Sequence, residues 1–142
     1  MANNPAVEGP FVLQIPGLYG EEDFSAYQFH FVKYHATEEN RVIAIADDGD
    51  FPVGILQNNP NVALHTSEVG ASAEMQVVTL GVSKLVAGED WSSTAPGTWI
   101  GPKGDGTGQV ATTGDWAFGW IQNGCGAGGV ATVVLAGPHI AP

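Results

Sequence analysis

Residues 75–86 read MQVVTLGVSKLV, and this stretch decides which fold class the sequence predicts. Val and Leu make up half of it, and Gly81 interrupts it in the middle. Residues of this kind favour β-strands, and a glycine inside a strand pattern indicates a bulge or a tight bend. We therefore expect two short strands, at residues 75–80 and 82–86, on either side of Gly81.

Similar runs lie on both sides of this stretch, separated by turn residues. The chain of 142 residues contains 20 glycines and 9 prolines, which leave pieces too short for ordinary helices. Only residues 88–93 could be helical. Short strands between turn signals predict an all-β fold, a small single-domain barrel or sandwich of antiparallel strands. The other expected strands are residues 27–34, 41–46, 53–56, 98–100, 109–111, 117–121 and 130–135, with hairpin loops at 102–108 and 122–129.

The run 27–34, YQFHFVKY, alternates aromatic and polar residues at first. On a strand, this places Tyr27, Phe29 and Phe31 on one face.

The N-terminal segment differs from the rest of the chain. Residues 3–20 contain three prolines and an apolar centre at residues 11–15. Two interpretations remain open, an extended arm that pairs with another surface and a first strand with a frayed tip. We accordingly divide the chain into an arm or edge strand at residues 1–22 and a β domain at residues 23–142.

The charge of the chain excludes several partners. It carries 15 acidic residues against 4 basic ones, a net charge of −11. Direct binding to DNA or RNA requires clustered cations that displace counterions, and binding to acidic membranes has the same requirement. No run approaches the length of a membrane-spanning helix, and residues 1–11 lack the features of a secretory signal. We expect neither nucleic acid nor membrane as a partner, and we expect synthesis in the cytoplasm of the host cell.

No group of residues indicates catalysis or metal binding. His30 and His35 are separated by an odd number of positions, so on one strand they would point to opposite faces. The histidines and the single Cys125 therefore do not form a metal-ligand pattern. The run 47–50, DDGD, lacks the ligand spacing of a calcium loop and predicts a turn. The glycine-rich run 124–129 precedes a strand pattern, so a hairpin tip is expected instead of a phosphate loop. We expect no catalytic residue, metal ion or cofactor. The remaining histidines are His65 and His139.

Four tryptophans are the last candidates for binding. Trp116 and Trp120 share strand parity with Phe118, which predicts an aromatic stripe that fills the core or a subunit interface. Exposed tryptophans can also stack on sugars, so a carbohydrate-binding module is the alternative from another functional class. The other two tryptophans are Trp91 and Trp99.

Three motifs occur in an order that resembles the capsid decoration (head cement) proteins of tailed bacteriophages. They are FVK at residues 31–33, GILQNNP at 54–60 and GVSK at 81–84. The resemblance extends over about residues 24–138. The sequence departs from the family pattern after residue 60 and after residue 88, which leaves open the roles of the loops there.

The resemblance implies a non-enzymatic structural protein, commonly a homotrimer, on the outer surface of the virion. Such a protein binds the major capsid protein of the expanded head and bridges neighbouring shell subunits against the pressure of the packaged DNA. The apolar arm could then add a strand to an edge of the shell. The candidate capsid contacts are Phe11, Val12, Leu13, Gln14 and Ile15.

Overall fold

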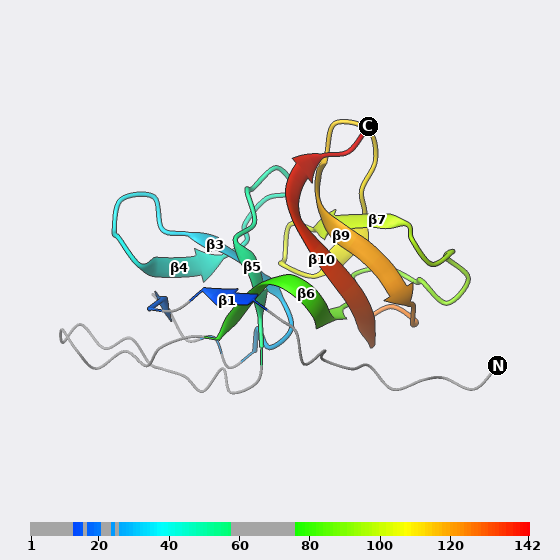
Figure 1. The fold of residues 1–142 in the computed structure, drawn as a ribbon, viewed down its shortest axis with the longest axis horizontal. Helices are drawn as coiled ribbons and strands as arrows, with labels where there is room; N and C mark the ends of the chain where they lie inside the picture. Colours follow the sequence, from blue (N-terminus) through cyan, green and yellow to red (C-terminus); the bar gives the residue numbers. More distant parts are fainter. Residues whose placement is uncertain (1–12, 16, 21–23, 25, 58–75) are drawn as a thin grey trace.

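A computed structural model describes residues 13–15, 17–20, 24, 26–57 and 76–142 (Figure 1). These residues form ten β-strands and no helix, so the prediction of a small all-β domain is confirmed. The strands belong to one sheet that is not closed into a barrel. They are β1 (Leu13–Ile15), β2 (Tyr19–Gly20), β3 (Phe31–Tyr34), β4 (Arg41–Ala44), β5 (Gly54–Leu56), β6 (Val77–Val86), β7 (Trp99–Pro102), β8 (Gly108–Val110), β9 (Trp116–Asn123) and β10 (Val130–Ile140).

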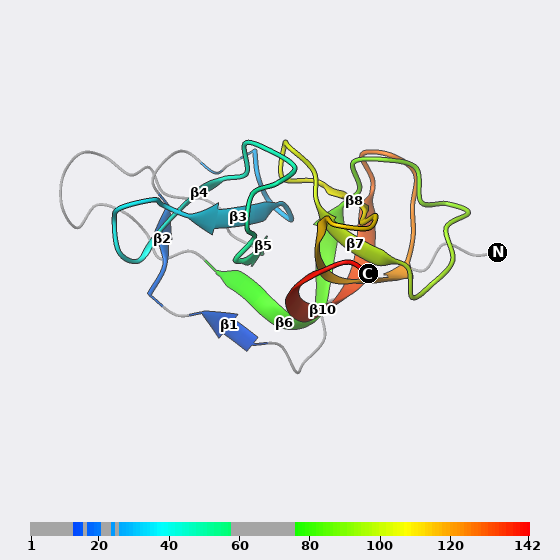
Figure 2. The same cartoon turned by 90° about the horizontal axis from the view of Figure 1, so that it is seen from above.

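The long strand β6 joins two halves of the sheet (Figures 1 and 2). We call β1 to β5 with the start of β6 the first half-sheet, and the end of β6 with β7 to β10 the second half-sheet. The strand order is β2-β4-β3-β5-β6-β10-β9-β7-β8, and β1 also pairs with β6. The first half of β6 pairs with β1 and β5, and the second half pairs with β10. The prediction of two strands here is wrong, because β6 continues through Gly81 with a φ of 99°. A glycine tolerates this backbone conformation and keeps its pairing with Leu135.

Both faces of the sheet are buried around Phe31–Val32 of β3, β5 and the start of β6, and alternate residues there pack on opposite sides. In β3, β5 and the start of β6, one residue enters the first core cluster and its neighbour enters the second. Near-continuous apolar runs are typical of strands covered on both faces, which accounts for the run at residues 53–56. The neighbouring pairs, first cluster before second, are Phe31 and Val32, Ile55 and Leu56, and Val78 and Val77.

The first core cluster extends across both halves of the sheet. It combines residues of β3, β5 and β6 with residues of β7, β9 and β10, so the two halves share one hydrophobic core. The second core cluster is confined to the first half. Leu18 and Phe24 belong to this cluster, and the partly buried Ile15 packs against it.

Two local predictions differ from the structure. Residues 27–30 are not part of a strand, Gln28 and Phe29 form a turn, and only Phe31–Tyr34 is a strand, so the predicted alternation of faces from Tyr27 is wrong. Phe29 has a φ of 61°, which interrupts an extended strand. Residues 88–93 are not helical, and the backbone N–H of Trp91 donates to the carbonyl of Cys125 at 2.7 Å.

Both predicted hairpins are present. Strands β7 and β8 pair antiparallel around the loop that precedes Gly108, and β9 and β10 pair antiparallel around the glycine-rich run 124–129. Strand β10 is longer than predicted and reaches Ile140. An isolated parallel bridge between Ala87 and Gly108 brings β8 beside the end of β6.

Candidate interaction surfaces

The part of the predicted arm that the structure describes is a strand of the sheet. Leu13 lies opposite Leu80, and Ile15 lies opposite Val77, in an antiparallel pairing between β1 and β6. This arrangement corresponds to the second interpretation of the segment, a first strand, for residues 13–15. Phe11 and Val12 lie outside the described residues.

Strand β1 presents apolar side chains to solvent. Leu13 is 54% exposed and Leu80 is 40% exposed, although both are large hydrophobic residues. Because Leu13 and Leu80 are paired across β1 and β6, they form one exposed apolar patch. Gln14 is also exposed. Within the described part of the chain, β1 pairs with β6 alone, so its other edge is a candidate for adding a strand.

The predicted stripe of Trp116, Phe118 and Trp120 is divided between two surroundings. Phe118 is fully buried and its ring centroid lies 5.8 Å from that of Phe31, inside the first core cluster. Trp120 is half-buried and contacts the ring of Trp99. Trp116 is also half-buried and contacts the ring of Phe51 in the β4–β5 loop.

The strand register explains this division. Phe118 and Ile121 both belong to the first core cluster although an odd number of positions separates them. Simple alternation is therefore interrupted in β9, between Phe118 and Ile121. A parity argument from the sequence assumes an unbroken strand and could not reveal this.

Four residues form a row across the second half-sheet on the face away from the core. Trp99 lies opposite Trp120, Trp120 opposite Val134, and Val134 opposite Val82. Directly opposite residues point to the same face. The adjacent row contains Ile100 and Leu135, which are buried in the first core cluster, so the first row faces outward.

Aromatic rings dominate one end of this row. The Trp99 and Trp120 ring centroids are 5.6 Å apart, and the His139 ring lies 4.5 Å from that of Trp99. We call this surface the outer aromatic face and define it by the four residues of the row together with His139. Its five residues, all half-buried, are Val82, Trp99, Trp120, Val134 and His139. Sequence parity did not identify Val82, Val134 or Trp99, because their proximity depends on pairing between distant strands.

Acidic residues are segregated from the strands. In the described part of the chain, every Asp and Glu lies in a turn or loop, and none lies on β1 to β10. The cations are held by local contacts. Lys33 pairs with Asp50 at 2.6 Å, Arg41 with Glu38 at 3.8 Å, Lys84 lies 5.2 Å from the centroid of the Phe29 ring, and Lys103 donates to the Gly88 carbonyl at 2.9 Å.

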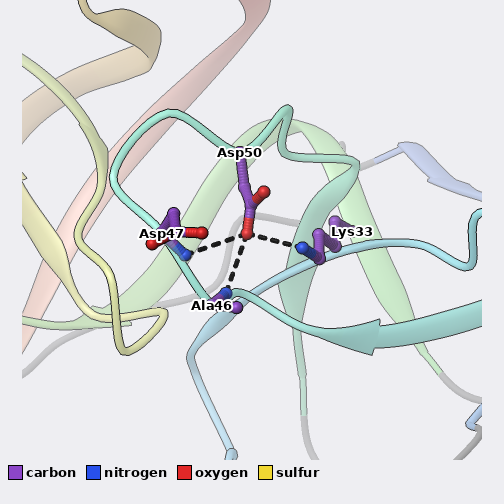
Figure 3. A network of polar contacts seen from close by, with 4 residues as sticks. All are labelled: Lys33, Ala46, Asp47 and Asp50. Atoms are coloured by element: carbon purple, nitrogen blue, oxygen red, sulfur yellow. Dashed lines mark hydrogen bonds and ion pairs between the residues drawn. The ribbon is translucent and has the colours of Figure 1, made fainter.

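The acidic run 47–50 is a turn, as predicted, and its last residue is fixed by three donors (Figure 3). One oxygen of Asp50 accepts hydrogen bonds from the Lys33 ammonium at 2.6 Å and from the backbone N–H groups of Ala46 at 2.8 Å and Asp47 at 3.0 Å. Burial favours the neutral acid, but these donors outweigh it and lower the pKa of Asp50. The carboxylate therefore stabilises the turn.

A second carboxylate fixes the loop after β6. One oxygen of Glu89 accepts the backbone N–H of Val110 at 2.5 Å and the indole N–H of Trp91 at 3.0 Å. Trp91 is only 1% exposed and belongs to the first core cluster. Nearby, burial and the carboxylate of Asp90 raise the pKa of the Cys125 thiol. This is opposite to the lowered pKa that activates a nucleophilic cysteine.

The structure brings no metal ligands together among the described residues. The Nδ1 atom of His35 accepts the backbone N–H groups of Thr37 at 3.3 Å and Glu38 at 3.0 Å inside the β3–β4 turn. His30 contacts the Tyr27 ring, and His139 belongs to the outer aromatic face. His65 lies outside the described residues. Among the described residues there is no helix of the length and apolar character needed to cross a membrane.

Comparison with known proteins gives a match at the level of fold. No family model matches the sequence, and no curated protein matches it. Among solved structures, the chain is similar to the head fiber gp8.5 N base of bacteriophage phi29, with a TM-score of 0.58 and 15% identity. The match covers 89% of this chain and 95% of that chain. The chain therefore shares its fold, over nearly its whole length, with the base of a phage head fiber.

Proposed function

We propose that this chain is a non-enzymatic structural protein of the tailed-phage head, located on the outer surface of the virion. The similarity of its fold to the N base of a phage head fiber carries this proposal, because it covers most of both chains. The three sequence motifs that resemble head decoration proteins support the same location. A fold alone does not determine function, so the binding surfaces have to be tested directly.

The proposed partner is the major capsid protein of the expanded head. Binding to the assembled shell, and not to a loosened one, stabilises the assembled shell by mass action. Many moderate contacts repeated over the shell add up through multivalency. In this role the protein bridges neighbouring shell subunits against the internal pressure of the DNA.

Strand β1 is the proposed contact with the shell. Its apolar residue Leu13 is exposed beside Leu80, and its outer edge has no strand partner within the described part of the chain. An extended segment of a shell subunit could pair with this edge by strand addition. Phe11, Val12, Gln14 and Ile15 complete the candidate contact in the sequence.

We also propose that the protein assembles with copies of itself, as a homotrimer. The carbohydrate-binding alternative depends on exposed tryptophans, and the structure buries Trp91 and leaves the other three half-buried. The aromatic residues are accordingly assigned to protein contacts.

The decisive experiment is co-sedimentation of the purified protein with expanded heads assembled without it. We expect saturable binding at a fixed ratio to shell subunits, and no saturable binding would refute the proposed function. The variant Leu13→Asp should weaken binding. Tyr34→Asp is the matched control, because Tyr34 is 48% exposed and lies on β3, which β5 and β6 separate from β1 in the sheet.

A truncation separates the role of the N-terminal residues from folding. Ile15 packs against the second core cluster, so a deletion should end before β1. Removal of residues 1–12 should leave the thermal unfolding transition in place and reduce binding to heads. Unchanged binding would exclude Phe11 and Val12 as contacts.

A further inference from the structure

We propose that the outer aromatic face is the surface through which copies of this chain contact one another. The inference rests on the self-association part of the proposed function and assigns that role to specific residues. It also distinguishes this face from β1, which is proposed to contact the shell.

The chemistry of the face suits a contact between proteins. Trp99 and Trp120 are packed against each other, and Val134 and Val82 extend the row over β10 and β6. Tryptophan is enriched among the residues that dominate binding energy at interfaces, and charged residues are depleted at interface centres. None of the five residues that define this face is a carboxylate or a lysine, and Lys84, two positions from Val82 on the same side of β6, lies at its border.

Charge favours this face over the acidic loops as the surface that a second copy would use. Each copy carries a net charge of −11, so a contact that brought the acidic loops of two copies together would be repulsive. The strands carry no Asp or Glu in the described part of the chain, and the outer aromatic face lies entirely on β6, β7, β9 and β10. A basic partner would gain from facing the acidic loops, whereas an identical acidic chain gains from avoiding them.

The other exposed aromatic contact fits a copy less well. Phe51 is 45% exposed and its ring centroid lies 4.9 Å from that of Trp116. Phe51 directly follows Asp50, and Trp116 directly follows Asp115. Carboxylates therefore border this pair on both chain segments, and two copies joined there would bring like charges close together.

A charge introduced into the face tests the assignment. Val134→Glu places a carboxylate in the middle of the row, where association would bring it into an apolar contact. We expect the dissociation constant for self-association, measured by sedimentation equilibrium of the full chain, to rise on the order of 10-fold or more. Added salt should recover part of this loss, because screening weakens repulsion between acidic copies.

Two further variants keep the test interpretable. Tyr34→Glu adds the same charge at an exposed position away from the face and should leave the dissociation constant unchanged. Val134→Thr keeps the shape of the side chain and adds only a hydroxyl group, so it should weaken association in the same direction without the risk that Val134→Glu fails to fold. Thermal unfolding of each variant verifies the fold.

The outcomes separate this inference from the proposed function. An oligomeric wild type whose association is unchanged in folded Val134→Glu and Val134→Thr would overturn the inference, while head binding of the wild type would still support the proposed function. If the variants kept their mass and lost head binding, the face would contact the shell, which also overturns the inference. A monomeric wild type at all concentrations would refute self-association itself.

Discussion

Replacement of Glu89 should destabilise the protein more than removal of any exposed carboxylate. One oxygen of Glu89 accepts two hydrogen bonds, from the indole N–H of Trp91 and the backbone N–H of Val110. Trp91 is among the largest fully buried side chains, and it lies in the core cluster shared by both halves of the sheet. The variant Glu89→Ala removes the acceptor and leaves both donors in place.

The magnitude follows from the burial of these donors. A buried donor without a partner costs about 1–3 kcal/mol, and the indole of Trp91 falls in this class. The N–H of Val110 is half-buried and should add about 1 kcal/mol. The sum, about 2–4 kcal/mol, is a large part of the stability of a typical domain and should lower the midpoint of thermal unfolding by roughly 10 °C.

Urea and thermal unfolding measure this effect. Glu89→Gln retains an amide oxygen in the same position and should lose only about 1 kcal/mol, because the acceptor is no longer charged. Glu39→Ala is the control, since it removes the same charge from an exposed position in the β3–β4 turn. A Glu89→Ala protein that unfolds within about 0.5 kcal/mol of this control would refute the reasoning.

Three further predictions concern other contacts. Gly81→Val should cost about 1–3 kcal/mol in urea unfolding, because Gly81 has a φ of 99° that a β-branched residue does not tolerate; an unchanged midpoint would contradict this. Asp50→Asn should lower stability at pH 7 by about 1–2 kcal/mol. The pKa of Asp50 is lowered in the folded protein. The contribution of Asp50 to the free energy of unfolding should therefore be complete above the ordinary pKa of 3.8 and disappear as the pH falls through the folded pKa. A stability difference between wild type and the Asn variant that persists in strong acid would oppose this account. The raised pKa of Cys125 predicts slow alkylation at neutral pH that accelerates in alkali, and Asp90→Asn should increase the neutral rate; a wild-type rate equal to that of an unfolded control would exclude a raised pKa.

The sequence predicted the fold class and most strands because both depend on local signals. Glycine and proline separate the strands, and β-formers fill them, so the two hairpins and the turn at residues 47–50 were predicted correctly. The failures occurred where tertiary contacts override local preference. Phe29 adopts a positive φ, and β6 remains one strand because pairing with β10 continues through Gly81.

The candidate surfaces were less accessible to sequence reasoning. The apolar centre at residues 11–15 identified a segment that includes β1, but its pairing with β6 depends on residues more than sixty positions away. The outer aromatic face requires the register of four strands, and an interruption of alternation in β9 separates Phe118 from Trp120. Neither property is encoded by spacing within one segment.

The position of β10 has a consequence for synthesis of the protein on the ribosome. This strand ends at Ile140, near the end of the chain, yet it pairs with both β6 and β9 and so completes the second half-sheet (Figure 1). A nascent chain that lacks β10 exposes the edges of both neighbours, and unpaired edges promote association between chains. Folding of this half therefore has to wait until β10 has been synthesised, and nascent chains stalled before Val130 should depend on chaperones that cover strand edges.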